Sequence, residues 1–176
     1  MQKVVLFITM CSLVSFAEPF KVETVVLPVV EPVMVVQEYV SPMAHVPEFL
    51  QEPIIATCFQ YRIPVGYFTK MLEQESGFDP NAKNYANENG TVDEGLVQVN
   101  SGFKDYFGWK YGIENFDPYK VEHALEFAGK HLAFLYEQTG DWELAFASYN
   151  AGLERVKSGD IPASTVEYVN IIFGRM

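Results

Sequence analysis

The stretch "MLEQESGFDP", residues 71–80, places a carboxylate on the apolar side of a helix, close to the helix end. Phe68, Met71 and Leu72 stand seven, four and three residues before Glu75. Side chains at these spacings lie on one face of an α-helix. Glu75 therefore shares the face that the other three residues would direct into a protein core, where a charge is poorly accommodated.

The same stretch predicts where this helix ends. We expect the helix to run from Pro64 to about Ser76, because proline is favoured at the first position of a helix. Gly77 can adopt the left-handed conformation that closes a helix, and Pro80 prevents the helix from continuing. Glu75 then lies in the last turn.

Two physical effects raise the pKa of Glu75 at this position. Burial beside apolar side chains disfavours the anion, and the negative end of the helix dipole does the same. Both move the pKa above its ordinary value of ~4.3. Glu73 points to the opposite face and Asp79 follows the helix end, so these two acids can stay solvated. Glu75 could then serve as a general acid near neutral pH, or it could only end the helix and bond the following loop.

The remainder of residues 51–176 predicts a mostly helical domain with one small β-hairpin. A first helix begins at about residue 51 and carries Ile54 and Cys58 at helical spacing. The dipeptide "NG" at residues 89–90 is a strong hairpin signal, and the alternating "VQVN" at residues 97–100 is typical of a strand.

Three more helices follow the hairpin. Asp117 and Pro118 form a cap and first residue for a long helix, whose apolar face consists of Val121, Ala124, Leu125, Ala128, Leu132 and Leu135. Asp141 can cap a helix that ends at Gly152. The capping box "STVE" at residues 164–167 predicts the start of the last helix.

The N-terminal residues 1–17, "MQKVVLFITMCSLVSFA", are typical of a secretory signal peptide. Lys3 supplies the positive start, an apolar run follows, and residues 15–17 form a small-x-small cleavage site. Lipid attachment through Cys11 is the alternative, but the bulky Met10 before it argues against a lipoprotein. We therefore expect export to the periplasm or cell envelope.

Residues 18–50 are rich in Val, Pro and Glu. Proline recurs every few residues, so neither a helix nor a central strand can run through the segment. The many valines are unusual for a fully solvated linker. We interpret the segment as an extended tether that can dock on the domain or on a partner.

Composition excludes several classes of function. The net charge of −11 becomes −12 when removal of the signal peptide takes away Lys3 and no acid, so nucleic acid is not an expected partner. Cys58 is then the single cysteine and is better interpreted as a buried apolar residue than as a reactive thiol. His45, His123 and His131 have no Cys or carboxylate at ligand spacing, so we expect no metal site.

Four short motifs occur in order: "ESGFDPNA" at residues 75–82, "GLVQVN" at 95–100, "ASYNAG" at 147–152 and "EYV" at 167–169. Together they resemble the catalytic domain of the soluble lytic transglycosylase family, which is related to goose-type lysozyme. The resemblance covers about residues 51–176. It implies a mainly α, lysozyme-like (α+β) fold with a small hairpin flanking a sugar-binding cleft, peptidoglycan glycan strands as the substrate, and no cofactor.

The resemblance places the general acid and base of the family on Glu75. In the family this residue protonates the glycosidic oxygen between N-acetylmuramic acid and N-acetylglucosamine. The resulting carboxylate takes the proton of the muramic C6 hydroxyl, which attacks its own C1 and leaves a 1,6-anhydro end. Val97 and Ser148 stand where the family usually has Met and Ala. Sugar-binding or orienting roles are implied for Ser76, Gln98, Tyr149, Asn150 and Tyr168.

The residues themselves leave simpler interpretations open. Gln98 could be a solvent-facing strand residue, Tyr149 could belong to the core, and Asn150 beside Gly152 could form a helix C-cap. Their positions in the motifs favour the site.

Two other functions remain as alternatives. A hydrolase of the same fold that acts by inversion needs a second carboxylate roughly 6.5–9.5 Å away, and Asp93 and Glu94 are the candidates near the motifs. An inactive glycan-binding or envelope-assembly protein could also keep the fold. We expect a monomer, and residues 18–50 leave open a link to secretion or flagellar machinery.

Overall fold

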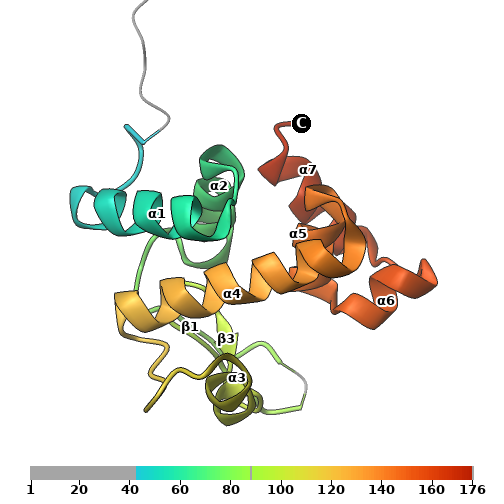
Figure 1. Ribbon diagram of the computed structural model, residues 1–176. Helices are drawn as coiled ribbons and strands as arrows, with labels where there is room; N and C mark the ends of the chain where they lie inside the picture. Colours follow the sequence, from blue (N-terminus) through green and yellow to red (C-terminus); the bar gives the residue numbers. More distant parts are fainter. Residues whose placement is uncertain (1–42, 88, 176) are drawn as a thin grey trace, which may run out of the picture. The chain divides into compact units, whose positions relative to one another are not determined.

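Seven helices and a small antiparallel sheet make up the described part of the chain, residues 43–87 and 89–175 of a computed structural model (Figure 1). The helices are α1 (Glu48–Tyr61), α2 (Val65–Ser76), α3 (Lys104–Tyr111), α4 (Val121–Thr139), α5 (Trp142–Ala151), α6 (Leu153–Ser158) and α7 (Ala163–Ile172). The strands are β1 (Lys83–Asn84), β2 (Asp93–Glu94) and β3 (Val99–Asn100). The predicted class, mainly helical with a small β element, is confirmed.

Helix α4 is the central element of this arrangement. In Figure 1 it crosses the middle of the folded part, with α1 and α2 on one side and the sheet and α3 on the other. Helices α5, α6 and α7 gather beyond its C-terminal end, where α5 packs on α4 and α7. None of the described helices is long and apolar enough to cross a membrane.

The folded domain begins earlier than residue 51. Helix α1 starts at Glu48, and the side chains of Met43, Val46 and Leu50 are buried in the core. The last residues of the segment that the sequence assigned to the tether, from Met43 to Leu50, thus contribute side chains to the core of the domain. The signal peptide, Cys11 and the rest of the tether lie outside the described residues.

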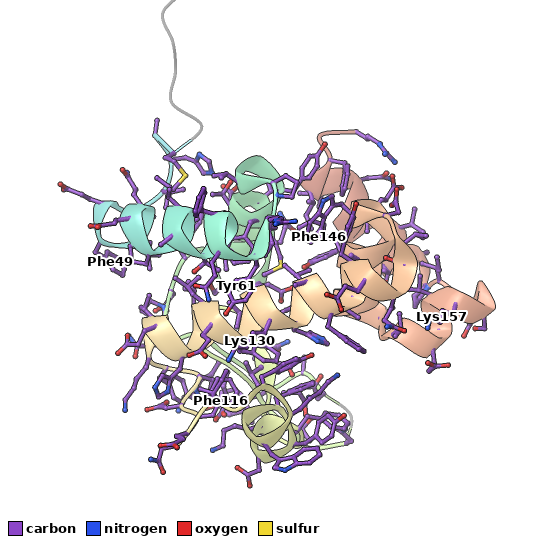
Figure 2. The ribbon with its side chains drawn as sticks, in the orientation of Figure 1. Phe49, Tyr61, Phe116, Lys130, Phe146 and Lys157 are labelled. Carbon is purple, nitrogen blue, oxygen red and sulfur yellow. The ribbon has the colours of Figure 1, made fainter. Side chains whose placement is uncertain are left out.

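Helix α1 contributes its apolar side to the core. Ile54 and Cys58 are buried as predicted, and burial raises the pKa of the Cys58 thiol to about 12. A Cβ on Gly129 of α4 would lie 2.2 Å from the ring of Tyr61, so α1 and α4 approach closely at this glycine. Figure 2 shows Tyr61 directed into the space between the two helices.

Helix α2 agrees closely with its prediction. Phe68, Met71 and Leu72 are fully buried on one face. The helix ends at Ser76, and Gly77 closes it in the left-handed conformation with its N–H donating to the Glu73 carbonyl.

The β element is more elaborate than the predicted hairpin. The strands pair antiparallel in the order β1-β2-β3, with Lys83 opposite Glu94 and Glu94 opposite Val99. Residues 89–90 lie within the loop that joins β1 to β2 and do not form a two-residue hairpin turn. Gln98 has a φ of 48°, so the extended conformation expected for residues 97–98 is wrong.

Gly95 explains why the chain turns before β3. Its φ is +76°, and a Cβ on this residue would lie 2.0 Å from the carbonyl oxygen of Pro118. Only glycine satisfies both demands. Residues 95–98 therefore form a tight turn packed on the segment that precedes α4.

Two helix starts differ from the sequence prediction. Asp117 caps a turn by accepting from the Tyr119 N–H, and α4 begins three residues after Pro118. Helix α7 begins at Ala163, so Ser164 is inside it and the predicted capping box does not form. The carbonyl of Pro162, the residue before α7, accepts from the N–H groups of Thr165 and Val166.

Helix α5 begins as predicted, because the Asp141 side chain accepts from the Leu144 N–H at 3.0 Å. It ends at Ala151, before Gly152. The apolar face expected for α4 is buried from Ala124 to Leu135. Helices α3 and α6 are additions to the sequence prediction.

Candidate active site

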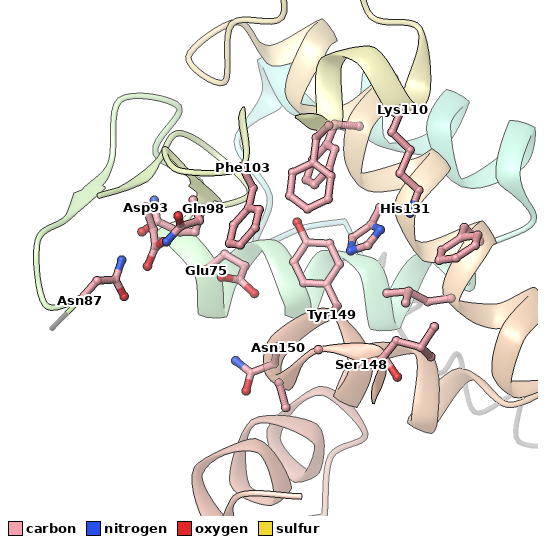
Figure 3. A pocket seen from close by; sticks show the side chains of 18 residues that line it. Glu75, Asn87, Asp93, Gln98, Phe103, Lys110, His131, Ser148, Tyr149 and Asn150 are labelled. Carbon is pink, nitrogen blue, oxygen red and sulfur yellow. The ribbon is translucent and has the colours of Figure 1, made fainter. Parts of the chain in front are cut away.

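Glu75 stands at the end of α2, where the helix meets a cleft of about 650 Å³. Its Oε1 atom accepts a hydrogen bond of 2.6 Å from the hydroxyl of Tyr168, on α7. The two residues are 93 positions apart in the chain, so the packing of α7 against α2 creates this contact. The carboxyl group is only partly exposed and faces the cleft (Figure 3).

The pKa of Glu75 is raised to about 7. Burial is the largest cause, and the negative charge of Asp93 acts in the same direction. The hydrogen bond from Tyr168 opposes both, because it stabilises the carboxylate. The direction agrees with the sequence prediction. A carboxyl with this pKa can both donate and accept a proton at neutral pH.

The cleft runs between the sheet, α3, α4 and the end of α5. Figure 3 shows Glu75 and Tyr149 near its middle, with Asn87, Asp93 and Gln98 to one side and Lys110 and His131 to the other. Aromatic rings and aliphatic side chains share its walls with these polar groups. A long groove of this mixed character suits a sugar chain, which offers flat apolar faces and hydroxyl groups.

The turn at residues 95–98 is attached to two helices that carry predicted site residues. The Ser76 hydroxyl donates to the Leu96 carbonyl at 2.8 Å, and the Tyr149 hydroxyl donates to the Val97 carbonyl at 2.9 Å. Tyr149 also lines the cleft, whereas Ser76 lies behind its wall. Ser76 is therefore placed to position the turn, and its sugar contact stays a prediction.

Gln98 and Asn150 both line the cleft. Gln98 donates through Nε2 to the Gly95 carbonyl at 2.9 Å, which orients its side chain within the turn. Asn150 accepts through Oδ1 from the Thr165 hydroxyl at 2.7 Å, a contact that leaves its amide N–H groups for a ligand. The side chain of Asn150 thus bonds across to α7 and does not cap its own helix.

The two acids beside the turn occupy different places. Asp93 lines the cleft and accepts from the Asn100 side chain at 2.9 Å. Glu94 accepts from the Tyr119 hydroxyl at 3.0 Å and is not part of the cleft wall. Of the two candidates for a second carboxylate, only Asp93 shares the cleft with Glu75.

Sequence reasoning missed part of the site because it missed α3. Lys110 of α3 and His131 of α4 both line the cleft. The Tyr111 hydroxyl lies 2.6 Å from His131 Nδ1, and burial, with the charge of Lys110 as a second cause, lowers the pKa of His131 to about 3. His131 is therefore neutral. The spacing of Phe103, Phe107 and Lys110, one helical turn apart, is the signal that could have indicated α3.

No group of three or more His, Cys, Asp or Glu side chains within residues 43–87 and 89–175 could hold a metal ion.

Residues 52–164 match the family of transglycosylase SLT domains, and the chain belongs to this family. Its fold is similar to that of the 70 kDa soluble lytic transglycosylase SLT70 from Escherichia coli, with a TM-score of 0.59 and 22% identity over 69% of this chain. No curated protein matches the chain.

A second similar structure is that of the lytic transglycosylase Slt from Pseudomonas aeruginosa, in an inactive variant with glutamine in place of a glutamate. The TM-score is 0.59, with 21% identity over 74% of this chain. The matches span only 22% and 23% of these two larger proteins. At this identity the likeness concerns the fold.

Proposed function

We propose that this protein is a peptidoglycan lytic transglycosylase that cleaves the β-1,4 bond between N-acetylmuramic acid and N-acetylglucosamine. The observation that carries the proposal is Glu75, a carboxyl group with a pKa of about 7 held by Tyr168 in the wall of a cleft. One residue that acts first as an acid and then as a base needs a pKa near the working pH.

The proposed reaction uses Glu75 twice. The protonated carboxyl gives its proton to the glycosidic oxygen as the bond to the muramic C1 breaks, and the N-acetylglucosamine side leaves as an alcohol. The carboxylate then takes the proton of the muramic C6 hydroxyl, whose oxygen bonds to C1. The product is a 1,6-anhydro end, no water is consumed, and Glu75 is protonated again for the next cycle.

The surrounding residues have positioning and binding roles in this proposal. Tyr168 orients the carboxyl group, and Ser76 and Tyr149 hold the turn that carries Gln98. Gln98 and Asn150 contact the sugar through their amide groups. Family membership and the two lytic transglycosylases of similar fold support this reading, as does the inactivity of the glutamate-to-glutamine variant of one of them.

A hydrolase that cuts the same bond is the second candidate. The observation that favours it is the presence of Asp93 in the same cleft, where its charge acts on Glu75. As a carboxylate it could activate a water molecule, and the product would then be a reducing muramic end. Asp93 is already bonded to Asn100, which is a structural use for its charge.

Digestion of purified sacculi tests whether the protein is an enzyme or only a glycan-binding protein. We expect the wild type to release soluble fragments and Glu75→Gln to release none while still binding sacculi. Glu73→Gln is the matched control, because Glu73 is two residues away and forms a surface ion pair with Lys70. Binding without digestion by the wild type would favour the inactive alternative.

The site of action follows from the substrate. We propose that the protein is exported by residues 1–17 and works as a monomer on glycan strands in the periplasm or cell envelope. Residues 18–50 would then link the enzyme to an envelope assembly such as a secretion or flagellar apparatus. Fractionation of cells that express the full chain tests the export.

A further inference from the structure

The two ends of the cleft differ in chemistry. On one side of Glu75 the wall is polar and acidic, with Asn87, Asp93, Gln98 and Asn100. On the other side it is formed by side chains of α3 and α4 and by the end of α5, and it contains one ammonium group and many apolar atoms (Figure 3). Hydroxyl groups of neutral sugar units can accept hydrogen bonds from an ammonium group, but only an anionic group of the substrate would also pair with its charge.

The cation is Lys110 of α3. Its Nζ atom lies 3.9 Å from the ring centre of Phe134, and the rings of Tyr111 and Tyr106 are 5.1 and 5.9 Å away. Aromatic rings hold the ammonium group through their faces and take no classical hydrogen bond from it. Its three N–H donors are therefore not consumed by these contacts.

Lys110 differs in this respect from four other cations of the domain, and it is the one lysine or arginine that lines the cleft in the described part of the chain. Lys70, Lys130, Arg155 and Arg175 each form an ion pair with a carboxylate. In the part of the chain that the structure describes, Lys110 forms none. Its partial burial lowers its pKa, as expected for a charge that lacks an acidic partner.

Lys110 also supplies the positive charge of this end of the cleft. His131 beside it is neutral, because burial and the nearby ammonium charge disfavour its protonation. The rest of the chain is acidic, with a net charge of −11, so an anionic ligand would be repelled at long range. A single cation that is held in place in the cleft can still bind such a ligand at short range.

We propose that Lys110 binds a carboxylate of the substrate and makes the cleft selective for muramic glycans that carry one. The inference rests on the proposed function. Peptidoglycan offers two sources of this chemistry, the free carboxylates of its peptide stems and the lactyl carboxylate that is exposed when a stem is removed. Lys110 is a binding residue here and takes no part in proton transfer.

Binding of three defined tetrasaccharides tests the proposal in the full-length Glu75→Gln protein, which keeps the ligands intact. The ligands are a stem-bearing muramic glycan, the same glycan after amidase treatment, and neutral chitotetraose. We expect Lys110→Met to weaken binding of a carboxylate-bearing glycan about tenfold, the range for one charge-assisted hydrogen bond, and to change chitotetraose binding less than about twofold. Weakened binding of the stem-bearing glycan alone identifies a stem carboxylate, and weakened binding of the amidase-treated glycan alone identifies the lactyl carboxylate.

Two further variants separate binding from folding. Lys110→Arg should keep most of the affinity, because it keeps the charge. Lys104→Met makes the same charge change on the same helix outside the cleft, and it should leave all three affinities unchanged.

The proposal is overturned if Lys110→Met weakens all three ligands equally or none of them. A different result would overturn the proposed function itself: wild-type protein that neither digests sacculi nor binds any of the three glycans. In that case the inference about Lys110 falls with it.

Discussion

Opposing effects hold the pKa of Glu75 at about 7. Burial at the end of α2 and the charge of Asp93 disfavour its anion, and the hydrogen bond from Tyr168 favours it. Removing the first effect would leave a carboxylate that cannot donate a proton at neutral pH. Removing the hydrogen bond from Tyr168 would raise the pKa of Glu75 further, so the carboxyl group would release its proton less readily. The carboxyl group would also be less firmly oriented in the cleft.

Tyr168→Phe tests this balance. Without the hydrogen bond the pKa of Glu75 rises, because the bond stabilises the carboxylate. Activity requires protonated Glu75 in the first step, so the alkaline limb of the kcat/KM profile should move to higher pH. We expect kcat to fall about tenfold as well, because the carboxyl loses the group that orients it. The pH dependence of sacculus solubilisation measures both effects.

Tyr136→Phe is the control for this variant. Tyr136 is an exposed residue of α4 that stacks on Trp142, outside the cleft. Removal of the Tyr136 hydroxyl should leave the pH dependence of kcat/KM unchanged. A Tyr168→Phe profile that coincides with the wild type would contradict the role given to Tyr168.

The same carboxyl group should reduce the stability of the fold at alkaline pH. Its pKa is about 7 in the folded state against 4.5 for the free group. Between these values the folded state holds a proton that the unfolded state has released, so the free energy of unfolding falls as pH rises. A pKa shift of this size lowers the free energy of unfolding by about 3 kcal/mol once the pH is above both pKa values.

Glu75→Gln removes this titration. We expect the stability advantage of the variant over the wild type to grow by about 3 kcal/mol between pH 4 and pH 8. Urea unfolding at a series of pH values measures it, and Glu73→Gln supplies a reference for an exposed acid. A difference between Glu75→Gln and wild type that does not change with pH would show that Glu75 is an ordinary exposed carboxylate.

At the scale of elements, the turn at residues 95–98 connects the parts of the site. It is bonded to α2 through Ser76 and to α5 through Tyr149, and it rests on the Pro118 carbonyl at Gly95. The turn therefore sets the position of Gln98 relative to Glu75. Its shape depends on Gly95 more than on any side chain.

Gly95→Ala should disturb the turn strongly, because Gly95 has a φ of +76° and its new Cβ would lie 2.0 Å from a backbone oxygen. Gly90→Ala is the matched control, since Gly90 has the same φ and open space around it. We expect the control to lose about 1 kcal/mol of unfolding free energy and Gly95→Ala at least twice as much, with loss of activity. Equal losses in urea unfolding would contradict the close packing at Pro118.

Local signals predicted some elements and failed for others, for identifiable reasons. Helix α2 and the cap at Asp141 were predictable because each has an apolar stripe or a capping side chain in its own sequence. The starts of α4 and α7 were not, since the Asp117 side chain caps a turn that precedes α4, and α7 begins one residue before Ser164. Tertiary contacts decide such ends.

The candidate site also contains residues that local sequence signals predicted and residues that they did not. Helical spacing predicts the apolar face on which Glu75 lies, and this face together with the last turn of the helix predicts the direction of its pKa shift. Its contact with Tyr168 joins residues 93 apart, so no local pattern contains it, and only the family motifs indicated Tyr168. Lys110 and His131 belong to no motif. They reach the cleft because α3 packs on α4, which the sequence pattern did not predict.

At the scale of the whole molecule, the start of the domain has a measurable consequence. A chain that begins at residue 51 lacks the buried side chains of Met43, Val46 and Leu50, whereas one that begins at residue 43 keeps them. We expect the shorter form to be less stable by about 3 kcal/mol or more, given ~1.5–3 kcal/mol for each fully buried apolar side chain. Thermal or urea unfolding measures the stability of the two forms. Equal stability would show that residues 43–50 do not contribute to the folded domain.

The fold, the cleft and Glu75 together carry the central claim that the protein cuts glycan strands by transglycosylation. Analysis of the muramic ends released from purified sacculi by the wild-type protein tests this claim most directly. The account predicts fragments with 1,6-anhydro-muramic ends, and none from Glu75→Gln. Fragments with mainly reducing muramic ends would contradict it and identify the protein as a hydrolase.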